Sequence, residues 1–538
     1  MLRRASSTPA CASADAAHRS FVSNLTSMDV SHRAARANVG DTSRLRWHLR
    51  RCTAGAAKGG ERGRLRVLGI GCSMTQGFMN CGGKVEGRQC GKACVKLRWA
   101  TLLQEMLQSA LPACDVEVLL QTSKGGRTVV AAARFDTRIL RYRPHIVITD
   151  LTVCDLRGIA SSLDEFRLQV GWESLLRKLL SVPADPSAPG EGSPAIVHIE
   201  SWDRFPMRGC RNATSRIYQG ISAFYRVPAV SFMLGVCAHD QRGDERHWTA
   251  GCSDGAMHCG ARGAHLDTRG AQCEPHPGPH VHALFALLLA ERIVHEAARG
   301  CAVAVKGARR FNKQGGGLGG LGGLGGLGGK LGSGGGAGGG GGARPAVAAM
   351  LEPPFALPSD APTLMPSAAL AEMSGCRMHH GVSKPTLTYD FGAACGTPAL
   401  PPVGWRCFED RPGKLGWIAD DDAPAAREEP LTFEAAASEL TPGARLTVAY
   451  LRSYERMGRA RLWLDDDVHL GVTLNGSWTA PTSQTDLAIL STSALCGPSC
   501  LALRGRGPQA RHRIRLERLR PPGGAPPKKF KLLLLELC

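Results

Sequence analysis

The stretch Val67-Leu68-Gly69-Ile70-Gly71-Cys72-Ser73-Met74-Thr75-Gln76-Gly77 decides how the first half of this chain is expected to fold. Its apolar beginning is typical of a buried β-strand, and the small residues that follow are typical of a tight turn. Parallel α/β sheets place their functional sites at the carboxyl ends of such strands. We therefore expect the hydroxyl of Ser73 to stand at a strand end, where a nucleophile can be presented. The alternative is a serine that only satisfies the turn.

Segments typical of strands alternate with segments typical of helices between residue 64 and about residue 310. The expected strands span residues 66–70, 116–120, 145–151, 195–199 and 229–232. The expected helices span residues 99–110, 171–180 and 282–298. Alternation of this kind predicts an α/β domain of three layers, in which helices cover both faces of a parallel sheet.

Composition divides the rest of the chain into three further parts. Residues 1–63 are rich in Ala, Arg and Ser without a hydrophobic signal segment, so we expect a disordered or targeting arm. Residues 311–380 are expected to be a disordered linker rich in Gly and Pro, because ordering so many glycines costs entropy. Residues 381–538 are expected to form a β-sandwich of jelly-roll type, from short strand candidates at close spacing. The candidates span residues 431–433, 445–451, 460–464, 470–474, 486–491, 501–503, 511–516 and 530–535.

The net charge of +20 comes mostly from arginine, and a basic chain can bind nucleic acid or another anionic surface. The arginines are scattered, however, and only 5% of the residues are aromatic, so the sequence contains no basic helix interleaved with stacking rings. We therefore expect no nucleic-acid partner. No apolar run reaches the length of about 18 residues that a membrane helix needs, so no transmembrane segment is expected.

Cysteine usage indicates where the protein works. Twenty cysteines and three N-x-S/T sequons favour an oxidising compartment, and we expect the secretory pathway or the extracellular space. The chain shows no clear signal peptide, so targeting to an organelle is the alternative.

Three later segments follow the Ser73 turn in a definite order. Residues 117–128 are typical of a strand ending in a Gly-Gly turn, and residues 144–155 of a strand ending in a polar tip. Residues 273–282, Cys-Glu-Pro-His-Pro-Gly-Pro-His-Val-His, precede a helix. In this order the four segments resemble the sequence blocks of the SGNH (GDSL-type) hydrolase family, over roughly residues 64–300. Residues around 416–417 and 451–458 resemble the β-rich C-terminal domain of some algal and plant members.

The resemblance implies a flavodoxin-like SGNH fold and a role for each matching residue. Ser73 lies at the position of the nucleophile, and His276 at that of the general base. The oxyanion hole would be formed by the backbone N–H groups of Ser73 and Gly126, together with Cys154. Asp155 lies at the second position of the family's Asn-Asp pair, although capping the next helix is an alternative role for it.

Three positions depart from the family pattern, and all three are cysteine. Cys72 replaces the Asp of the first block, Cys154 the oxyanion-hole Asn, and Cys273 the Asp that precedes the catalytic His. A thiol is only a weak hydrogen-bond donor, and the loss of one oxyanion donor typically costs about 10²–10³ in rate. Two of these cysteines could form a disulfide, the three with His276 could hold zinc, or all three could be neutral replacements. A backbone carbonyl, Glu274 or Asp267 could orient His276 in place of Cys273.

These features predict an esterase or acetylesterase that acts on carbohydrate or lipid esters through a Ser–His acyl-enzyme mechanism. We expect a small-molecule or polysaccharide ester as substrate, and no cofactor or metal ion. A binding protein that keeps the fold without activity is one alternative, because the family's Asn and Asp positions are lost. A sugar O-acyltransferase that uses the same residues is another.

Overall fold

The computed structural model contains all 538 residues and describes a defined part of them. The described residues are 9–28, 30–36, 38, 40–56, 63–73, 75–77, 96–122, 127–133, 135, 139–156, 162–182, 192–200, 213–232, 234–235, 279–315, 357, 361–366, 370, 387–390, 403–409, 415–419, 429–440, 444–454, 456–477, 483–496, 510–521 and 528–537. All structural statements below concern these residues.

The first domain is built on a parallel five-stranded sheet with the strand order β2-β1-β3-β4-β5, as the alternating pattern predicts. Its strands are β1 (Gly63–Gly71), β2 (Cys114–Thr122), β3 (Ile146–Asp150), β4 (Ala195–Glu200) and β5 (Ala229–Ser231). The register places Gly71 opposite both Thr122 and Asp150, so β1, β2 and β3 end together. The turn that holds Ser73 therefore leaves the sheet at the carboxyl edge, where α/β proteins place their sites.

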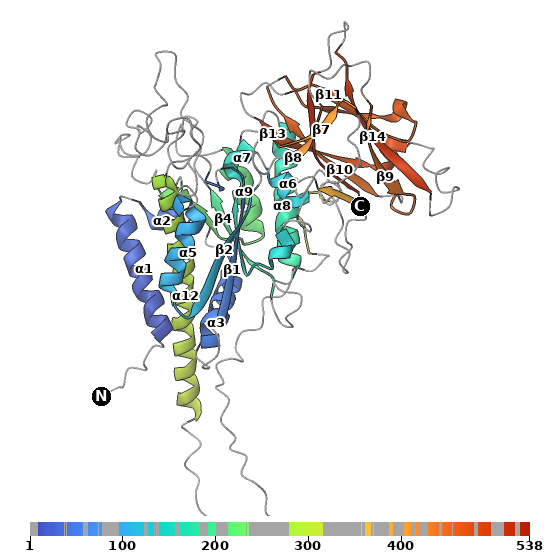
Figure 1. The fold of residues 1–538 in the computed structure, drawn as a ribbon. Coiled ribbons are helices and arrows are strands. Elements are labelled where there is room, and N and C mark those ends of the chain that lie inside the picture. Colours follow the sequence, from blue (N-terminus) through green and yellow to red (C-terminus); the bar gives the residue numbers. More distant parts are fainter. Residues whose placement is uncertain are drawn as a thin grey trace, which may run out of the picture.

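Helices cover both faces of this sheet (Figure 1). One face shares a core with α1 (Pro9–Ser27), α3 (Ser43–Ala56), α5 (Trp99–Ala110) and α12 (Pro279–Gly315). The other face packs against α6 (Thr128–Ala133), α8 (Ser162–Ser181) and α9 (Ala213–Phe224). Val67 belongs to the first core and Leu68 to the second, because successive side chains of a strand point to opposite faces. The shorter helices are α2 (His32–Ala35), η2 (Leu140–Tyr142) and α7 (Thr152–Leu156).

The expectation of a disordered arm over residues 1–63 is wrong for its described part. Helices α1 and α3 pack into the first core, and disulfides join Cys11 to Cys301 and Cys52 to Cys114. The segment is poor in large apolar residues, which is why its composition suggests disorder. Its few apolar side chains nevertheless recur at helical spacing, and Leu25 is 0% exposed.

The second domain contains two antiparallel sheets that enclose a common core, in agreement with the predicted β-sandwich. One sheet has the order β13-β10-β15-β8-β7 with β6 beside β15, and the other β12-β11-β14-β9. Their bounds are β6 (Leu387–Asp390), β7 (Trp405–Glu409), β8 (Leu415–Ala419), β9 (Leu431–Ala436), β10 (Arg445–Arg452), β11 (Arg459–Leu464), β12 (Val472–Asn475), β13 (Gln484–Ser491), β14 (Arg511–Leu519) and β15 (Phe530–Leu537), with η5 (Val468–Leu470) and α14 (Thr492–Cys496) between strands. The sequence did not predict β6, β7 and β8, and the expected strand at 501–503 lies outside the described residues.

Part of the expected linker is docked on the first domain. Glu173 of α8 accepts hydrogen bonds from the backbone N–H groups of Leu364 (2.8 Å) and Met365 (2.7 Å). Arg177, one turn later, donates to the carbonyl of Ala361 (3.0 Å). The expectation of a disordered segment over residues 311–380 therefore fails for residues 361–366, whose backbone groups bind side chains of α8. The domain boundaries themselves remain predictions.

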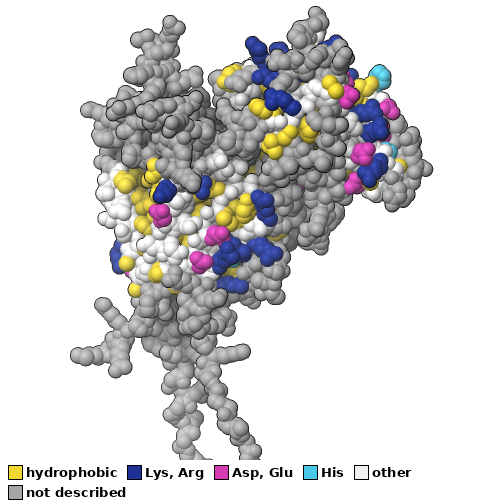
Figure 2. All heavy atoms as spheres, viewed as in Figure 1, with side chains coloured by type: hydrophobic (Ala, Val, Ile, Leu, Met, Phe, Trp, Pro, Cys, Tyr) yellow, Lys and Arg dark blue, Asp and Glu magenta, His cyan; other side chains and the backbone are white. Residues whose placement is uncertain are grey.

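The surface in Figure 2 carries basic side chains on both domains, interspersed with acidic and apolar ones.

No helix among the described residues is both long enough and apolar enough to cross a bilayer.

Candidate functional site

A buried threonine, Thr75, fixes the turn after β1 through hydrogen bonds. Thr75 Oγ1 donates to the Oδ2 atom of Asp150 (2.8 Å) and accepts from the backbone N–H of Cys72 (3.1 Å). Gly71 is required here, since a Cβ at this position would lie 1.7 Å from Thr75 Oγ1. These contacts fix the backbone on both sides of Ser73, which is itself half-buried at the strand end.

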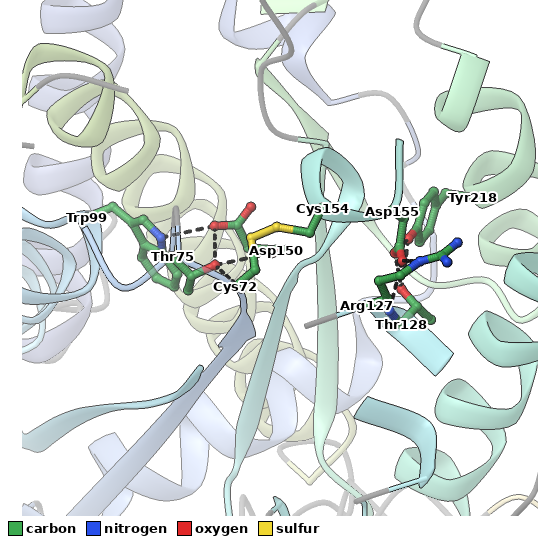
Figure 3. Close-up of a disulfide and its surroundings, with 9 residues drawn as sticks. All are labelled: Cys72, Thr75, Trp99, Arg127, Thr128, Asp150, Cys154, Asp155 and Tyr218. Carbon is green, nitrogen blue, oxygen red and sulfur yellow. Dashed lines mark hydrogen bonds and ion pairs between the residues drawn. A yellow bond between two sulfur atoms is a disulfide. The ribbon is translucent and has the colours of Figure 1, made fainter. Parts of the chain in front are cut away.

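A disulfide joins Cys72 to Cys154 and so links the Ser73 turn to α7 (Figure 3). The Cα atoms are 6.4 Å apart, within the range that disulfides span. The sequence left open a disulfide, a zinc site or three neutral cysteines, and Cys72 and Cys154 form the disulfide. The two positions that match the block-one Asp and the oxyanion Asn of SGNH hydrolases are thus joined by one covalent bond.

This bond corrects the expectation that Cys154 donates a hydrogen bond to an oxyanion. A disulfide sulfur carries no proton, so the S–H donor does not exist in this form. The backbone N–H of Cys154 is already bonded to the carbonyl of Leu151 (3.0 Å). Cys154 therefore contributes a crosslink rather than a donor.

The sequence did not single out Asp150, which is 3% exposed at the end of β3. Its Oδ2 atom also accepts from the indole N–H of Trp99 (3.3 Å), the first residue of α5. The backbone N–H of Trp99 in turn lies 3.3 Å from Nδ1 of His282 in α12. A polar network thus runs from the Ser73 turn to the beginning of the helix that follows His276. The signal available in the sequence was an acidic residue at the carboxyl end of a buried strand.

Asp155 is completely buried and binds a different segment from the one expected. Its Oδ1 atom accepts the backbone N–H of Thr128 (3.0 Å), the first residue of α6, and Arg127 Nε lies 3.6 Å away. The hydroxyl of Tyr218 in α9 donates to Oδ2. Burial raises the pKa of Asp155, and Arg127 and these hydrogen bonds oppose that rise. Asp155 therefore caps the start of α6, which begins two residues after Gly126.

Gly126, Cys273 and His276 lie outside the described residues. The structure brings Cys72, Ser73 and Cys154 together at the carboxyl edge of the sheet. The structure also describes residues near the others in the sequence. Arg127, which follows Gly126, lies beside Asp155, and His282, six residues after His276, lies beside Trp99. The meeting of Ser73 with His276 and Gly126 stays a prediction.

A search of protein-family models finds no match to the chain, and a search of curated proteins finds none either. Among solved structures, the chain is similar to a two-domain esterase active on acetylated mannans, with 15% identity and a TM-score of 0.51. That match covers 94% of this chain and 98% of the esterase. A second structure of the esterase, crystallised with mannopentaose, gives 16% identity, 94% and 97% coverage and a TM-score of 0.48. An acetyl xylan esterase matches at 14% identity over 42% of this chain and 98% of its own, with a TM-score of 0.29.

The chain has the fold of a two-domain esterase. At 15% identity this likeness concerns the fold, and it extends over both domains. The match agrees with the architecture that the sequence predicts, an α/β domain followed by a β-sandwich. The three disulfides between described residues fit an oxidising environment.

Proposed function

We propose that this protein is an SGNH-like serine hydrolase that cleaves acetyl or similar ester groups from a carbohydrate. One observation carries the proposal: the turn of Ser73 stands at the carboxyl end of β1, braced by Thr75 and Asp150, in a chain with the fold of a two-domain esterase. A serine held on a braced turn at this edge is suited to nucleophilic attack, because its backbone need not reorganise during the reaction.

In the proposed mechanism, Ser73 Oγ attacks the ester carbonyl carbon while His276 accepts the hydroxyl proton. The backbone N–H groups of Ser73 and Gly126 stabilise the oxyanion of the tetrahedral intermediate. The intermediate collapses to an acyl-enzyme, and His276 returns the proton to the departing sugar hydroxyl. Water then attacks the acyl group with His276 as base, which releases the acid and restores Ser73.

The disulfide decides how strong the oxyanion hole can be. With Cys154 oxidised, the proposed hole has two backbone donors and lacks a side-chain donor. A missing donor typically lowers the rate by about 10²–10³, so we expect a slow enzyme rather than an inactive one. The crosslink offsets part of this loss, because it holds the Ser73 turn against α7 in one arrangement.

A polysaccharide is the proposed substrate because the likeness to the esterase active on acetylated mannans covers 94% of this chain and so includes its β-sandwich. This support is an analogy of fold. A binding protein without turnover is the second candidate, and the conversion of the Asn position into a disulfide favours it.

Hydrolysis of p-nitrophenyl acetate and of acetylated mannan tests the proposal. The wild type should release nitrophenol and acetate, and Ser73→Ala should lower kcat/KM by about 10³-fold or more. Ser27→Ala, at an exposed serine in α1, is the matched control and should keep full activity. Undiminished turnover by Ser73→Ala would remove Ser73 as the nucleophile. Mannan binding without acetate release would identify the protein as a binding protein.

A further inference from the structure

A cluster of three metal-ligating side chains lies between α1 and α12, and the proposed esterase site uses none of them. It consists of His18, Glu291 and His295. His18 Nε2 lies 3.1 Å from Glu291 Oε1 and 3.2 Å from His295 Nδ1. The three ligand atoms all lie within 4.8 Å of one another.

The positions of these residues are set by the fold before any ion binds. Glu291 and His295 are four residues apart on α12, so they share one face of the helix. His18 comes from α1, which packs along α12 in the first core. The disulfide between Cys11 and Cys301 crosslinks the same two helices. The cluster is therefore preorganised, which lowers the cost of assembling it around an ion.

Two of the three separations between the ligand atoms match those of a tetrahedral ion, and the third is at most 4.8 Å. Zinc binds His nitrogen and carboxylate oxygen at about 2.0–2.2 Å, which places neighbouring ligand atoms about 3.3–3.5 Å apart in a tetrahedron. The two measured separations, 3.1 and 3.2 Å, are close to this edge length. Two imidazoles and one carboxylate form a common protein ligand set for zinc, with the fourth position open to water.

His18 Nε2 has two neighbours that compete for it. It lies 3.1 Å from Glu291 Oε1 and 3.2 Å from His295 Nδ1, and Arg36 NH1 lies 3.5 Å from the other ring nitrogen of His295. An imidazole nitrogen carries at most one proton, so His18 Nε2 can donate to only one of these two neighbours. A cation among the three ligand atoms would be bound by all of them.

Arg36 is the main charge that opposes a metal ion at this place. It is hydrogen-bonded to Glu291 Oε1, and its side chain is 19% exposed. The guanidinium thus takes the place of a cation, and it would have to move for a metal ion to bind. Glu291 is 1% exposed and His18 is 21% exposed, so the carboxylate is the buried ligand and His18 the one nearest to solvent. His32 and Arg292 also act on this carboxylate electrostatically.

We propose that His18, Glu291 and His295 bind one zinc ion, in competition with Arg36, and that the ion fastens α1 to α12. Zinc suits the mixed imidazole and carboxylate set better than magnesium or calcium, which prefer oxygen ligands alone. The site ties the N-terminal helix to the helix that follows His276. It stands independently of the proposed esterase function.

Cobalt titration of the full, oxidised chain tests the site, after alkylation of free thiols to remove cysteine ligands. Wild type should bind one Co²⁺ with the visible absorption of a tetrahedral centre and no thiolate-to-cobalt charge transfer, and Zn²⁺ should displace it. His18→Ala and His295→Gln should each weaken binding at least tenfold. Arg36→Gln should tighten binding, because it removes the competing cation. His469→Ala, at an exposed histidine of the second domain, is the control and should leave affinity unchanged.

A thermal melt adds a second readout that does not depend on any variant. Zn²⁺ should raise the Tm of the wild type, and EDTA should reverse the rise. Absence of a tetrahedral cobalt spectrum in the wild type would overturn the proposal. Binding that survives His18→Ala unchanged would overturn it as well, whatever the esterase assay shows.

Discussion

At the scale of single residues, the Cys72–Cys154 disulfide is the feature that defines this site. In the family pattern these positions carry a carboxylate and an amide, which act through hydrogen bonds. Here the two side chains form one covalent link between the end of β1 and α7. The link holds the turn against α7 and carries no amide donor, so in the proposed mechanism the oxyanion is stabilised by backbone N–H groups alone.

Restoring the polar pair should therefore raise activity. We expect Cys72→Asp with Cys154→Asn to increase kcat/KM on an acetyl ester by about 10²-fold, because the amide adds an oxyanion donor. Cys72→Ser with Cys154→Ser is the matched control, since it also breaks the disulfide but supplies no amide. If both double variants have equal activity, the position of Cys154 does not face the oxyanion. Steady-state kinetics of the three proteins decide between these results.

At the scale of elements, the packing of β4 against α8 and α9 buries a titratable ring. His198 of β4 is 0% exposed, stacks on Tyr218 at 4.7 Å and contacts Trp172. Its Nδ1 atom lies 3.0 Å from Thr149 Oγ1. Burial lowers the pKa of His198 to about 3, because the protonated ring would lose its hydration without gaining a counter-charge.

This burial predicts acid destabilisation of the first domain. The unfolded chain protonates His198 below about pH 6.5, whereas the folded chain does so only near pH 3, so the unfolded state binds more protons in between. Stability is full above pH 6.5 and falls as the pH decreases, by about 2 kcal/mol between pH 7 and pH 5 from this residue. Urea denaturation at the two pH values measures the effect. His198→Gln should show a smaller difference than the wild type, and an equal difference would exclude His198 as the cause.

At the scale of the whole molecule, the N-terminal helices are part of the first domain. α1 and α3 share one core with the sheet, and two disulfides tie them to distant segments. The core of the first domain therefore includes α1 and α3 from its N-terminal part and α12 from its C-terminal part. The likeness in fold to the two-domain esterase covers 94% of the chain and is not limited to residues 64–300.

A pair of substitutions in α1 tests this assignment. Leu25→Ala removes a side chain that is 0% exposed in the first core and should lower the free energy of unfolding by about 2–5 kcal/mol. Ser23→Ala, at an exposed position of the same helix, should change it by less than about 0.5 kcal/mol. Chemical denaturation of both variants gives the comparison. If both variants have the same free energy of unfolding, α1 is not part of the first core, and the disordered arm that its composition suggests is correct.

The sequence predicted those features that depend on neighbouring residues. Strand and helix periodicity located all five strands of the parallel sheet and the helix Trp99–Ala110, because each pattern lies within a short segment. The Ser73 turn was found in the same way. The strands β6, β7 and β8 of the second domain were missed. The order of four blocks was enough to indicate the esterase-like architecture.

Tertiary structure alone decided which distant residues meet. Cys72 and Cys154 are 82 residues apart, and Cys11 and Cys301 are 290 apart, so no local pattern could pair them. The same holds for His18 with Glu291, and for Asp155 with the start of α6. The physical reason is that periodicity reports which face of a segment is buried, whereas partners across the core are chosen by packing of the whole chain.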